Sequence, residues 1–396
     1  CMFMQQRYKD AVEAYDGVLK DYFDVNDIYP YYQSAVSYGL SGNNARKVSL
    51  LSNVRKASPS SYFYPEAMYE LGRSLVAVGK PDEAAECFNT LAANVRDSIY
   101  IARSYIELGM ICRNRSDNAK ALSYYKKVVE DMPLSEYADA ALLAIESIYK
   151  SQNAPEEYLA YIESIGKSSL KTEAEKEMMI YNAGEQIFLS ENYPKAIASL
   201  GSYLEKYPSG KMVTNAEYYL GECYRLTGQP ETACDHYERV MSAGTGPFLD
   251  QASLNYADLS YSMQKYADAY TAYSALNGRT GDRDAAFRSL VGMMRSAFRG
   301  RMYDEAISSS WRLGKEPGLA GDLLRESEYV RAKSLLATSR RDEAFVLLAR
   351  LAEAPSTPEG AEAAYLMIQD NYDRGEFQKV EEMVYAFSDS GTGENY

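Results

Sequence analysis

The chain has 396 residues, 46% of them hydrophobic, and its 42 basic and 56 acidic residues give a net charge of −14. This charge argues against nucleic acid, whose binding rests on Lys and Arg neutralising phosphates, and against docking on anionic lipid. No run of 18 apolar residues occurs, so no transmembrane helix and no direct membrane insertion are predicted. The chain starts at Cys1 without a signal peptide, and we expect it to be part of a longer protein.

A small residue in a helical context recurs every 36 to 38 residues, which indicates a repeat protein. The clear copies are Ala11, Ala84, Ala121, Ala196, Ala233, Ala269, Ala306 and Ala344, and the weaker ones are Val48, Tyr158 and Val380. Twelve residues earlier stands a second small residue in many copies, such as Gly72 or Gly221, and four residues later a large one, such as Phe88 or Tyr237. We expect the small residues to meet where two antiparallel helices cross, and the large one to fill the space towards the next hairpin.

In chain order, residues 1–23 are expected to hold a short stub and the second helix of an incomplete first repeat. Helix pairs are then predicted at 28–40 and 45–56, 65–78 and 81–94, 98–113 and 118–131, and 137–151 and 155–165. Six further repeats follow, with second helices around the marks from Ala196 to Val380, and residues 389–396 form an inter-repeat loop. The fold predicted is an all-α, right-handed superhelical solenoid of about eleven helical hairpins with a period of about 37 residues.

The fifth repeat departs from the pattern. Glu146 and Tyr158 stand where two small residues should meet, and the polar segment 166–173 follows. We therefore predict the least regular junction here, and an N-terminal sub-array at 1–165 (repeats 1–5) followed by a C-terminal sub-array at 166–396 (repeats 6–11). The two are expected to continue as one solenoid, and an ordinary degenerate repeat is the equal alternative.

The repeat resembles the tetratricopeptide repeat, whose signature has Leu-Gly and an aromatic residue in the first helix, and Ala, an aromatic residue and Pro in the second. Here the pattern reads Leu220-Gly221 with Tyr224, and Ala121 with Tyr125 and Pro133. The resemblance covers residues 6–388. The repeats are about 37 residues long rather than 34, which is similar to bacterial cell-envelope members such as the outer-membrane assembly lipoprotein and the Tol–Pal accessory protein. This implies a periplasmic or outer-membrane-associated location, with the cytoplasm as the alternative.

Catalytic patterns are missing from the sequence. The only histidine, His236, occupies a packing position of its repeat, and no Gly-x-Ser-x-Gly elbow, phosphate loop or histidine-rich metal motif occurs. Cys223 and Cys234 lie on opposite helices of one hairpin, so a disulfide is conceivable, but buried thiols acting as small apolar residues are the favoured reading. We predict no enzyme, no cofactor and no metal site.

The resemblance implies a binding groove lined by the first helices. Mapped one repeat at a time, the groove residues are expected to be Tyr69, Arg73, Tyr181, Glu185, Phe188, Asn215, Tyr218, Glu222, Arg225, Asp258, Tyr261, Arg295, Phe298, Tyr329, Lys333 and Tyr365. Arg288 and Tyr372 occupy equivalent positions. Exposed aromatic rings beside a few charges are typical of binding surfaces, although some of the 37 tyrosines could instead pack on one another.

Two functional hypotheses follow. The first is a non-catalytic scaffold that binds a peptide or partner protein in this groove, in a cell-envelope assembly. The second is a glycan-binding module that uses the tyrosines as stacking platforms; a single Trp counts against it. Acidic residues outnumber basic ones on the central strip, so the ligand is expected to be basic or polar and to bind more weakly at high salt. Replacing Tyr181 and Tyr218 by Ala is expected to weaken binding without disturbing the fold, and weak end-to-end self-association is expected from the apolar edge at Met2–Met4.

Overall fold

The computed structural model describes residues 2–21, 24, 27–319 and 321–388. These residues form 21 α-helices and three short 3-10 helices and contain no β-strand, so the predicted all-α repeat solenoid is confirmed. The handedness of the superhelix stays a prediction. The chain divides into an N-terminal unit, Cys1–Lys176, and a C-terminal unit, Glu177–Tyr396. The sub-array boundary expected after residue 165 likewise stays a prediction.

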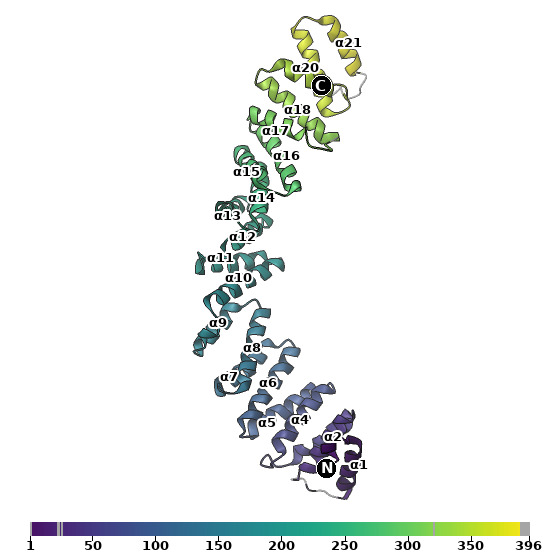
Figure 1. Ribbon diagram of the computed structural model, residues 1–396, viewed down its shortest axis with the longest axis vertical. Helices are drawn as coiled ribbons and strands as arrows, with labels where there is room; N and C mark the ends of the chain where they lie inside the picture. Colours follow the sequence, from purple (N-terminus) through teal and green to yellow (C-terminus); the bar gives the residue numbers. More distant parts are fainter. Residues whose placement is uncertain (1, 22–23, 25–26, 320, 389–396) are drawn as a thin grey trace. The chain divides into compact units, whose positions relative to one another are not determined.

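Within the N-terminal unit, helices that follow one another in sequence pack side by side (Figure 1). The α-helices are α1 (Tyr8–Asp21), α2 (Tyr29–Leu40), α3 (Asn44–Leu51), α4 (Tyr64–Ala77), α5 (Pro81–Asn94), α6 (Ser98–Asn114), α7 (Asn118–Asp131), α8 (Glu136–Ser151) and α9 (Pro155–Ser164). Three 3-10 helices accompany them: η1 (Phe3–Gln5), η2 (Ser52–Lys56) and η3 (Ser168–Leu170).

The C-terminal unit repeats the same arrangement. It begins within α10 (Glu173–Leu189) and continues through α11 (Tyr193–Lys206), α12 (Val213–Leu226), α13 (Pro230–Ala243), α14 (Leu249–Ser262), α15 (Tyr266–Arg279), α16 (Arg283–Arg299), α17 (Tyr303–Leu313), α18 (Gly321–Ala337), α19 (Arg341–Leu351), α20 (Pro358–Asp373) and α21 (Phe377–Ser388). Even-numbered helices from α2 to α20 are the first helices of hairpins, and odd-numbered ones from α3 to α21 are the second. The loop expected at 389–396 lies outside the described residues.

One predicted helix is shorter than expected. The helix expected at 45–56 ends as α3 at Leu51 and continues as the 3-10 helix η2. Ser52 Oγ donates to the carbonyl of Val48 at 2.8 Å, and Asn53 Nδ2 donates to the carbonyl of Leu50 at 3.3 Å. Side chains that compete for the last helical carbonyls in this way disfavour continuation of an α-helix.

Every described hairpin turns in the same way. Between each first and second helix one residue has a positive φ, and the series runs Gly42, Gly79, Ser116, Asn153, Glu191, Gly228, Gln264, Arg301, Ser339 and Gly375. The next amide closes the turn, as where Gln229 N donates to the carbonyl of Tyr224 at 2.9 Å, which is the Schellman pattern of a helix end. The regular period of the sequence therefore reflects a turn of fixed geometry.

The second helices begin with recognisable capping signals. The side chains of Asn43, Asp117 and Asn192 accept hydrogen bonds from backbone amides three residues later. Other second helices start with proline at the first or second position, as at Pro81 and Pro230. Both devices deal with amides that have no partner inside the helix, which explains why these helix starts could be read from sequence.

The repeating alanines are buried, as predicted, and those at positions 84, 121, 196, 233, 269, 306 and 344 are completely inaccessible. The large residues make a further contact that the sequence did not predict. A Cβ built on Gly221 would lie 2.6 Å from the ring of Tyr237, and one on Gly109 would lie 2.5 Å from the ring of Tyr125. These rings therefore lie against the bare backbone of their own hairpin's first helix, and the Tyr237 ring also shares a buried cluster with Ala252 of the next hairpin.

Gly221→Ala is expected to lower the free energy of unfolding by about 1–3 kcal/mol, because the added methyl overlaps the buried ring of Tyr237. Gly201→Ala in α11 is the matched control, since a Cβ there would meet no atom within 4 Å. The control is expected to be stabilised by about 0.5–1 kcal/mol from helix propensity. Urea unfolding followed by circular dichroism measures both, and an equal response of the two variants would contradict the close packing.

Repeat five contains a polar cluster at the predicted mismatch. Glu146 on α8 is buried, accepts from Tyr158 OH at 3.2 Å, and pairs with Lys150 at 2.8 Å and Lys171 at 3.0 Å. Burial raises the pKa of the Glu146 carboxyl, but the two lysines outweigh burial and hold it below its ordinary value. At this position, where other repeats bring two small residues together, repeat five thus has a carboxylate whose charge is paired with two lysines. The irregular crossing geometry expected at this junction stays a prediction.

Candidate interaction surface

The first helices of each unit carry polar side chains that bond from one first helix to the next, and we call this surface the first-helix face. In the N-terminal unit, Tyr69 OH on α4 donates to Glu107 Oε1 on α6 at 3.0 Å, and Arg73 Nε lies 3.7 Å from the same carboxylate. Arg103 on α6 donates to Tyr137 OH on α8 at 2.7 Å. The two predicted groove residues of this unit, Tyr69 and Arg73, therefore already have partners within the repeat array.

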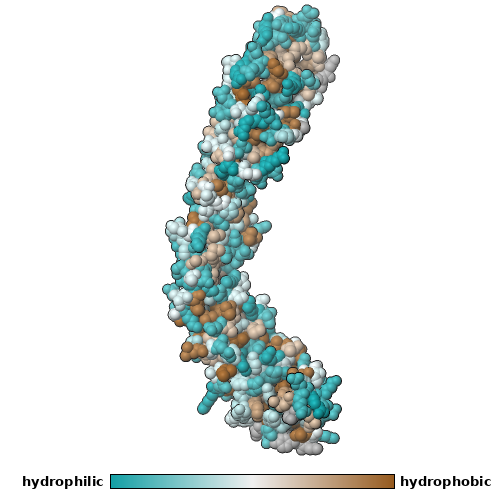
Figure 2. All heavy atoms as spheres, viewed as in Figure 1, coloured by the Kyte–Doolittle hydropathy of each residue, from teal (hydrophilic) through white to brown (hydrophobic). Residues whose placement is uncertain are grey.

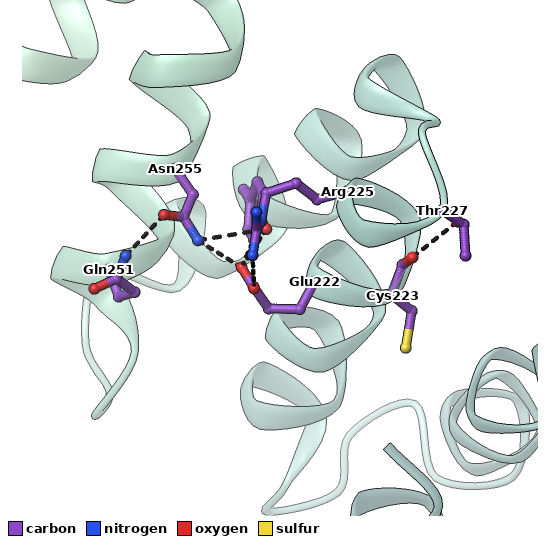
Figure 3. A network of polar contacts seen from close by, with 7 residues as sticks. Glu222, Cys223, Arg225, Thr227, Gln251 and Asn255 are labelled. Carbon is purple, nitrogen blue, oxygen red and sulfur yellow. Dashed lines mark hydrogen bonds and ion pairs between the residues drawn. The ribbon is translucent and has the colours of Figure 1, made fainter. Parts of the chain in front are cut away.

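In the C-terminal unit, Glu222 on α12 is the centre of such a network (Figure 3). It is buried and accepts from Tyr237 OH, from Asn255 Nδ2 on the next first helix, and from Arg225 Nη2 at 2.6 Å. Burial, followed by the hydrogen bond to Glu222, raises the pKa of the Tyr237 phenol. Gln251 extends the network by donating to Asn255 Oδ1 at 2.7 Å. Glu222 thus joins two helices of one hairpin to the next hairpin.

The same arrangement recurs one period later in a more open form. Asp258 on α14 accepts from Tyr273 OH and lies 3.5 Å from Arg288 Nη2 on α16. Unlike Glu222, Asp258 is exposed. Burial, followed by the hydrogen bond to Asp258, raises the pKa of the Tyr273 phenol.

Further along, ion pairs continue from each first helix to the next. Arg295 on α16 makes a two-pronged pair with Glu326 on α18, with both N–O distances 2.7 Å. Lys333 Nζ on α18 lies 2.6 Å from Glu362 Oε1 on α20, and Tyr329 OH donates to the other oxygen. Burial raises the pKa of Glu362, but these two donors outweigh it and hold the pKa below its ordinary value.

Two predicted groove residues are not available to a ligand, so the expectation of exposure is wrong for them. Tyr181 is only 1% exposed, with its ring against Tyr203 and its hydroxyl donating to Glu185 Oε1 at 2.9 Å. Glu222 is buried in the network described above. The helical spacing placed both on the correct face, but the packing of the second-helix rings Tyr203 and Tyr237 covers them.

Three other predicted aromatic residues, Tyr218, Phe188 and Tyr261, are partly covered by other rings. Tyr218 stacks on Phe248 with centroids 4.2 Å apart, and burial, followed by the Glu222 charge, raises its phenol pKa to about 12. Phe188 contacts Tyr219 at 4.8 Å, and Tyr261 contacts Tyr266 at 5.4 Å. Three more predicted residues are placed as follows: Asn215 and Phe298 are half-buried, and Tyr365 is exposed.

A cavity of about 640 Å³ opens on the first-helix face of the C-terminal unit. Its walls come from α14, α15, α16 and α18, and it brings together the predicted residues Asp258, Tyr261 and Arg295, with Arg288. The sequence reading missed its other walls: Tyr273, Phe287, Val291, Gly292, Asp322, Leu323 and Glu326. A volume of this size is within the range of ligand-binding pockets.

Gly292 is the sequence signal that could have pointed to this cavity. In the ninth repeat the small residue lies fourteen rather than twelve positions before the mark Ala306, and Met294 takes the usual position. A Cβ on Gly292 would lie 2.5 Å from the ring of Tyr273, which belongs to the preceding hairpin. Phe287 and Val291 have the spacing of ordinary core residues, so periodicity alone could not show that they line an opening.

Hydrophobic residues on the face shown in Figure 2 form small patches among hydrophilic ones rather than one continuous band. No described helix is long and apolar enough to cross a membrane. Across the described ranges, no group of three or more His, Cys, Asp or Glu side chains is placed to hold a metal ion. The surface therefore offers local sites within a polar exterior.

His236 and the cysteines occupy packing positions. His236 stacks on Tyr224 with centroids 5.2 Å apart, and its Nδ1 lies 2.6 Å from Glu217 Oε2. Cys223 and Cys234 are buried free thiols, and burial raises their pKa values to about 12 and about 11. A thiol with a raised pKa is a poor nucleophile at neutral pH.

Comparison with protein families matches two segments to tetratricopeptide repeat models, residues 69–141 and residues 215–243. The chain contains tetratricopeptide repeats. Repeats of this kind generally mediate protein–protein interaction. No curated protein matches the sequence.

Several solved structures align with these tetratricopeptide repeats at low identity. A chain of Naa15/Naa10 bound to HypK-THB aligns over 98% of this chain and 62% of that one, with 13% identity and a TM-score of 0.35. PilF of Pseudomonas aeruginosa aligns over 56% of this chain and 95% of its own, with 20% identity and a TM-score of 0.29. A tetratricopeptide repeat protein from Parabacteroides merdae aligns over 67% and 98%, with 12% identity and a TM-score of 0.32. The chain thus spans less than two thirds of the first of these.

Proposed function

We propose that the chain is a non-catalytic scaffold that binds a peptide segment or partner protein on the first-helix face of its C-terminal unit. The observation that supports this proposal is the 640 Å³ cavity between α14, α16 and α18. Its apolar walls include Phe287, Val291 and Leu323, and charged side chains surround them. An apolar pocket with a few convergent polar groups is the usual form of a binding site.

The charges of the cavity are largely neutralised by one another. Arg288 pairs with Asp258, Arg295 pairs with Glu326, and Asp322 pairs with Arg325. A ligand charge would have to compete with these pairs, so an apolar side chain inserted over Val291 is proposed as the main source of affinity. Three acidic and two basic residues line the cavity, and the proposed ligand is therefore a polar or basic extended segment with an apolar anchor residue.

A cell-envelope location, periplasmic or associated with the outer membrane, is part of the proposal. It is supported by the length of the repeats, about 37 residues. The turns with a positive φ recur along the chain with the same period. The glycan-binding hypothesis gains no support from the described residues. The tyrosines expected to act as platforms, such as Tyr69, Tyr181 and Tyr218, pack on other rings or donate hydrogen bonds to carboxylates.

Val291→Arg is expected to weaken peptide binding at least tenfold, because a long side chain would occupy the cavity and place a charge at its apolar wall. The ligands would be peptides selected on the unmodified chain from a displayed random library, and their affinities would be measured by fluorescence polarisation. A tenfold loss corresponds to about 1.4 kcal/mol, which is the scale of an interface anchor.

Val18→Arg on α1 is the matched control, since Val18 is exposed and lies outside this cavity. It should leave the affinity of the selected peptides unchanged. If the selected peptides bound the Val291→Arg variant as tightly as the unmodified chain, the first-helix cavity would not be the binding site.

A further inference from the structure

A second cavity, of about 420 Å³, lies away from the first-helix cavity, between the second helices α17 and α19 and against α18. Its walls include Trp311 near the end of α17, Lys315 in the turn that follows, Arg331 on α18 and Val346 on α19. Trp311 is the only tryptophan of the chain, and 45% of its surface is exposed; Val346 is 64% exposed. These two side chains give the cavity an exposed apolar wall.

Two of the three cations that line this cavity, Lys315 and Arg331, make no ion pair among the described residues, in contrast to the cations of the first-helix face. Lys315 Nζ lies 3.3 Å from the centroid of the Trp311 ring, and no ion pair of Lys315 with a carboxylate is found in the described part of the chain. Arg331 Nε is buried without a hydrogen-bond partner. Arg225, Arg288, Arg295 and Lys333 on the first-helix face each pair with an acidic residue.

The two carboxylates that line this cavity are already paired with other cations. Glu328 pairs with Arg350 at 2.6 Å, and Glu343 makes two hydrogen bonds of 2.8 Å to Arg340. A buried donor without an acceptor is costly, and an ionised acceptor forms the strongest bond to a guanidinium. The cavity therefore presents unmatched positive charge on a chain whose net charge is −14.

We propose that this second cavity binds an acidic, apolar peptide segment of a partner protein. An aliphatic side chain of the segment lies between Trp311 and Val346, and a neighbouring carboxylate pairs with Arg331 and Lys315. The apolar walls supply contact area and the two cations supply charge complementarity. This surface is formed mainly by second helices, so its occupancy does not depend on the ligand proposed for the first-helix cavity.

The single tryptophan makes the proposal directly measurable, because its fluorescence reports on this cavity alone. The probe is a five-residue peptide of alternating aspartate and leucine, blocked at both ends, titrated into the full chain. The comparison peptide has asparagine in place of aspartate. If the peptides did not contact the cavity cations, the net charge of −14 on the chain would repel the aspartate peptide, and it would bind more weakly than the asparagine peptide. We expect the reverse: a saturable change in Trp311 emission and at least tenfold tighter binding of the aspartate peptide.

Arg331→Gln is expected to reduce the affinity for the aspartate peptide at least tenfold and leave the asparagine peptide unaffected. Arg299→Gln on α16 changes the net charge equally, lies outside the cavity, and should bind as the unmodified chain does. Circular dichroism checks that both variants remain folded, and Lys315→Gln repeats the test if Arg331→Gln does not fold. Equal binding of the two peptides, or no saturable emission change, would overturn the proposal. So would an equal response to inorganic phosphate, which would indicate a simple anion site.

The first-helix variant Val291→Arg separates this proposal from the one above. It should not alter the Trp311 response to the aspartate peptide, because Val291 does not line the second cavity. Loss of that response in Val291→Arg would mean that the peptide occupies the first-helix cavity, and the assignment of the acidic segment to the second cavity would be wrong.

Discussion

Tyr181→Ala is expected to lower the free energy of unfolding of the C-terminal unit by about 3–5 kcal/mol, the range for removing a large buried aromatic side chain. The Tyr181 ring is 1% exposed and contacts Tyr203 at 5.7 Å, while its hydroxyl bonds to Glu185. The substitution would leave a cavity and remove the donor to a half-buried carboxylate. Urea unfolding followed by far-UV circular dichroism measures the effect.

Tyr372→Ala is the control for this prediction. Tyr372 was also expected in the groove, in the eleventh repeat, and it is 61% exposed. Its removal should change the free energy of unfolding by less than about 1 kcal/mol, as for most surface substitutions. If Tyr181→Ala were as stable as Tyr372→Ala, the burial of Tyr181 would be wrong, and the original expectation of an exposed groove tyrosine would be restored.

Glu222→Ala is expected to cost about 2–3 kcal/mol of stability. It would leave the buried Tyr237 hydroxyl without its acceptor and also remove the partner of Asn255 and Arg225. An unsatisfied buried polar group costs about 1–3 kcal/mol, and the charge of Arg225 adds little because that side chain is exposed and can be solvated. Denaturant unfolding of the variant at neutral pH gives the value.

Two further variants test the reason for this loss. Asp258→Ala removes the equivalent carboxylate one period later, but Asp258 is exposed, so water can replace it and a loss of only about 1 kcal/mol is expected. Glu222→Gln keeps an acceptor oxygen and should recover part of the stability lost in Glu222→Ala. Equal losses for Glu222→Ala and Asp258→Ala would show that burial is not what makes the Glu222 network important.

The sequence by itself determined the repeat and the course of the backbone. The second helices Pro81–Asn94 and Asn118–Asp131 have the bounds that the sequence predicted. Local signals explain this success. A proline or an Asn or Asp cap determines where a second helix starts. The turn residue two positions after a first helix determines where that first helix ends. The buried alanines could also be read from sequence, since close helix contact admits only small side chains.

Tertiary structure alone decided which residues of the first-helix face are open. Glu222 and Asp258 occupy equivalent positions of their repeats in the sequence, yet Glu222 is buried whereas Asp258 is exposed and lines a cavity. The small residue of the ninth repeat is displaced to Gly292, and the Tyr273 ring packs there on α16, the first helix of the next hairpin. The cavity lined by Phe287 and Val291 lies beside this contact. Helical spacing assigns a side chain to a face, but its exposure depends on the rings contributed by neighbouring helices, and those contacts are set by packing across hairpins.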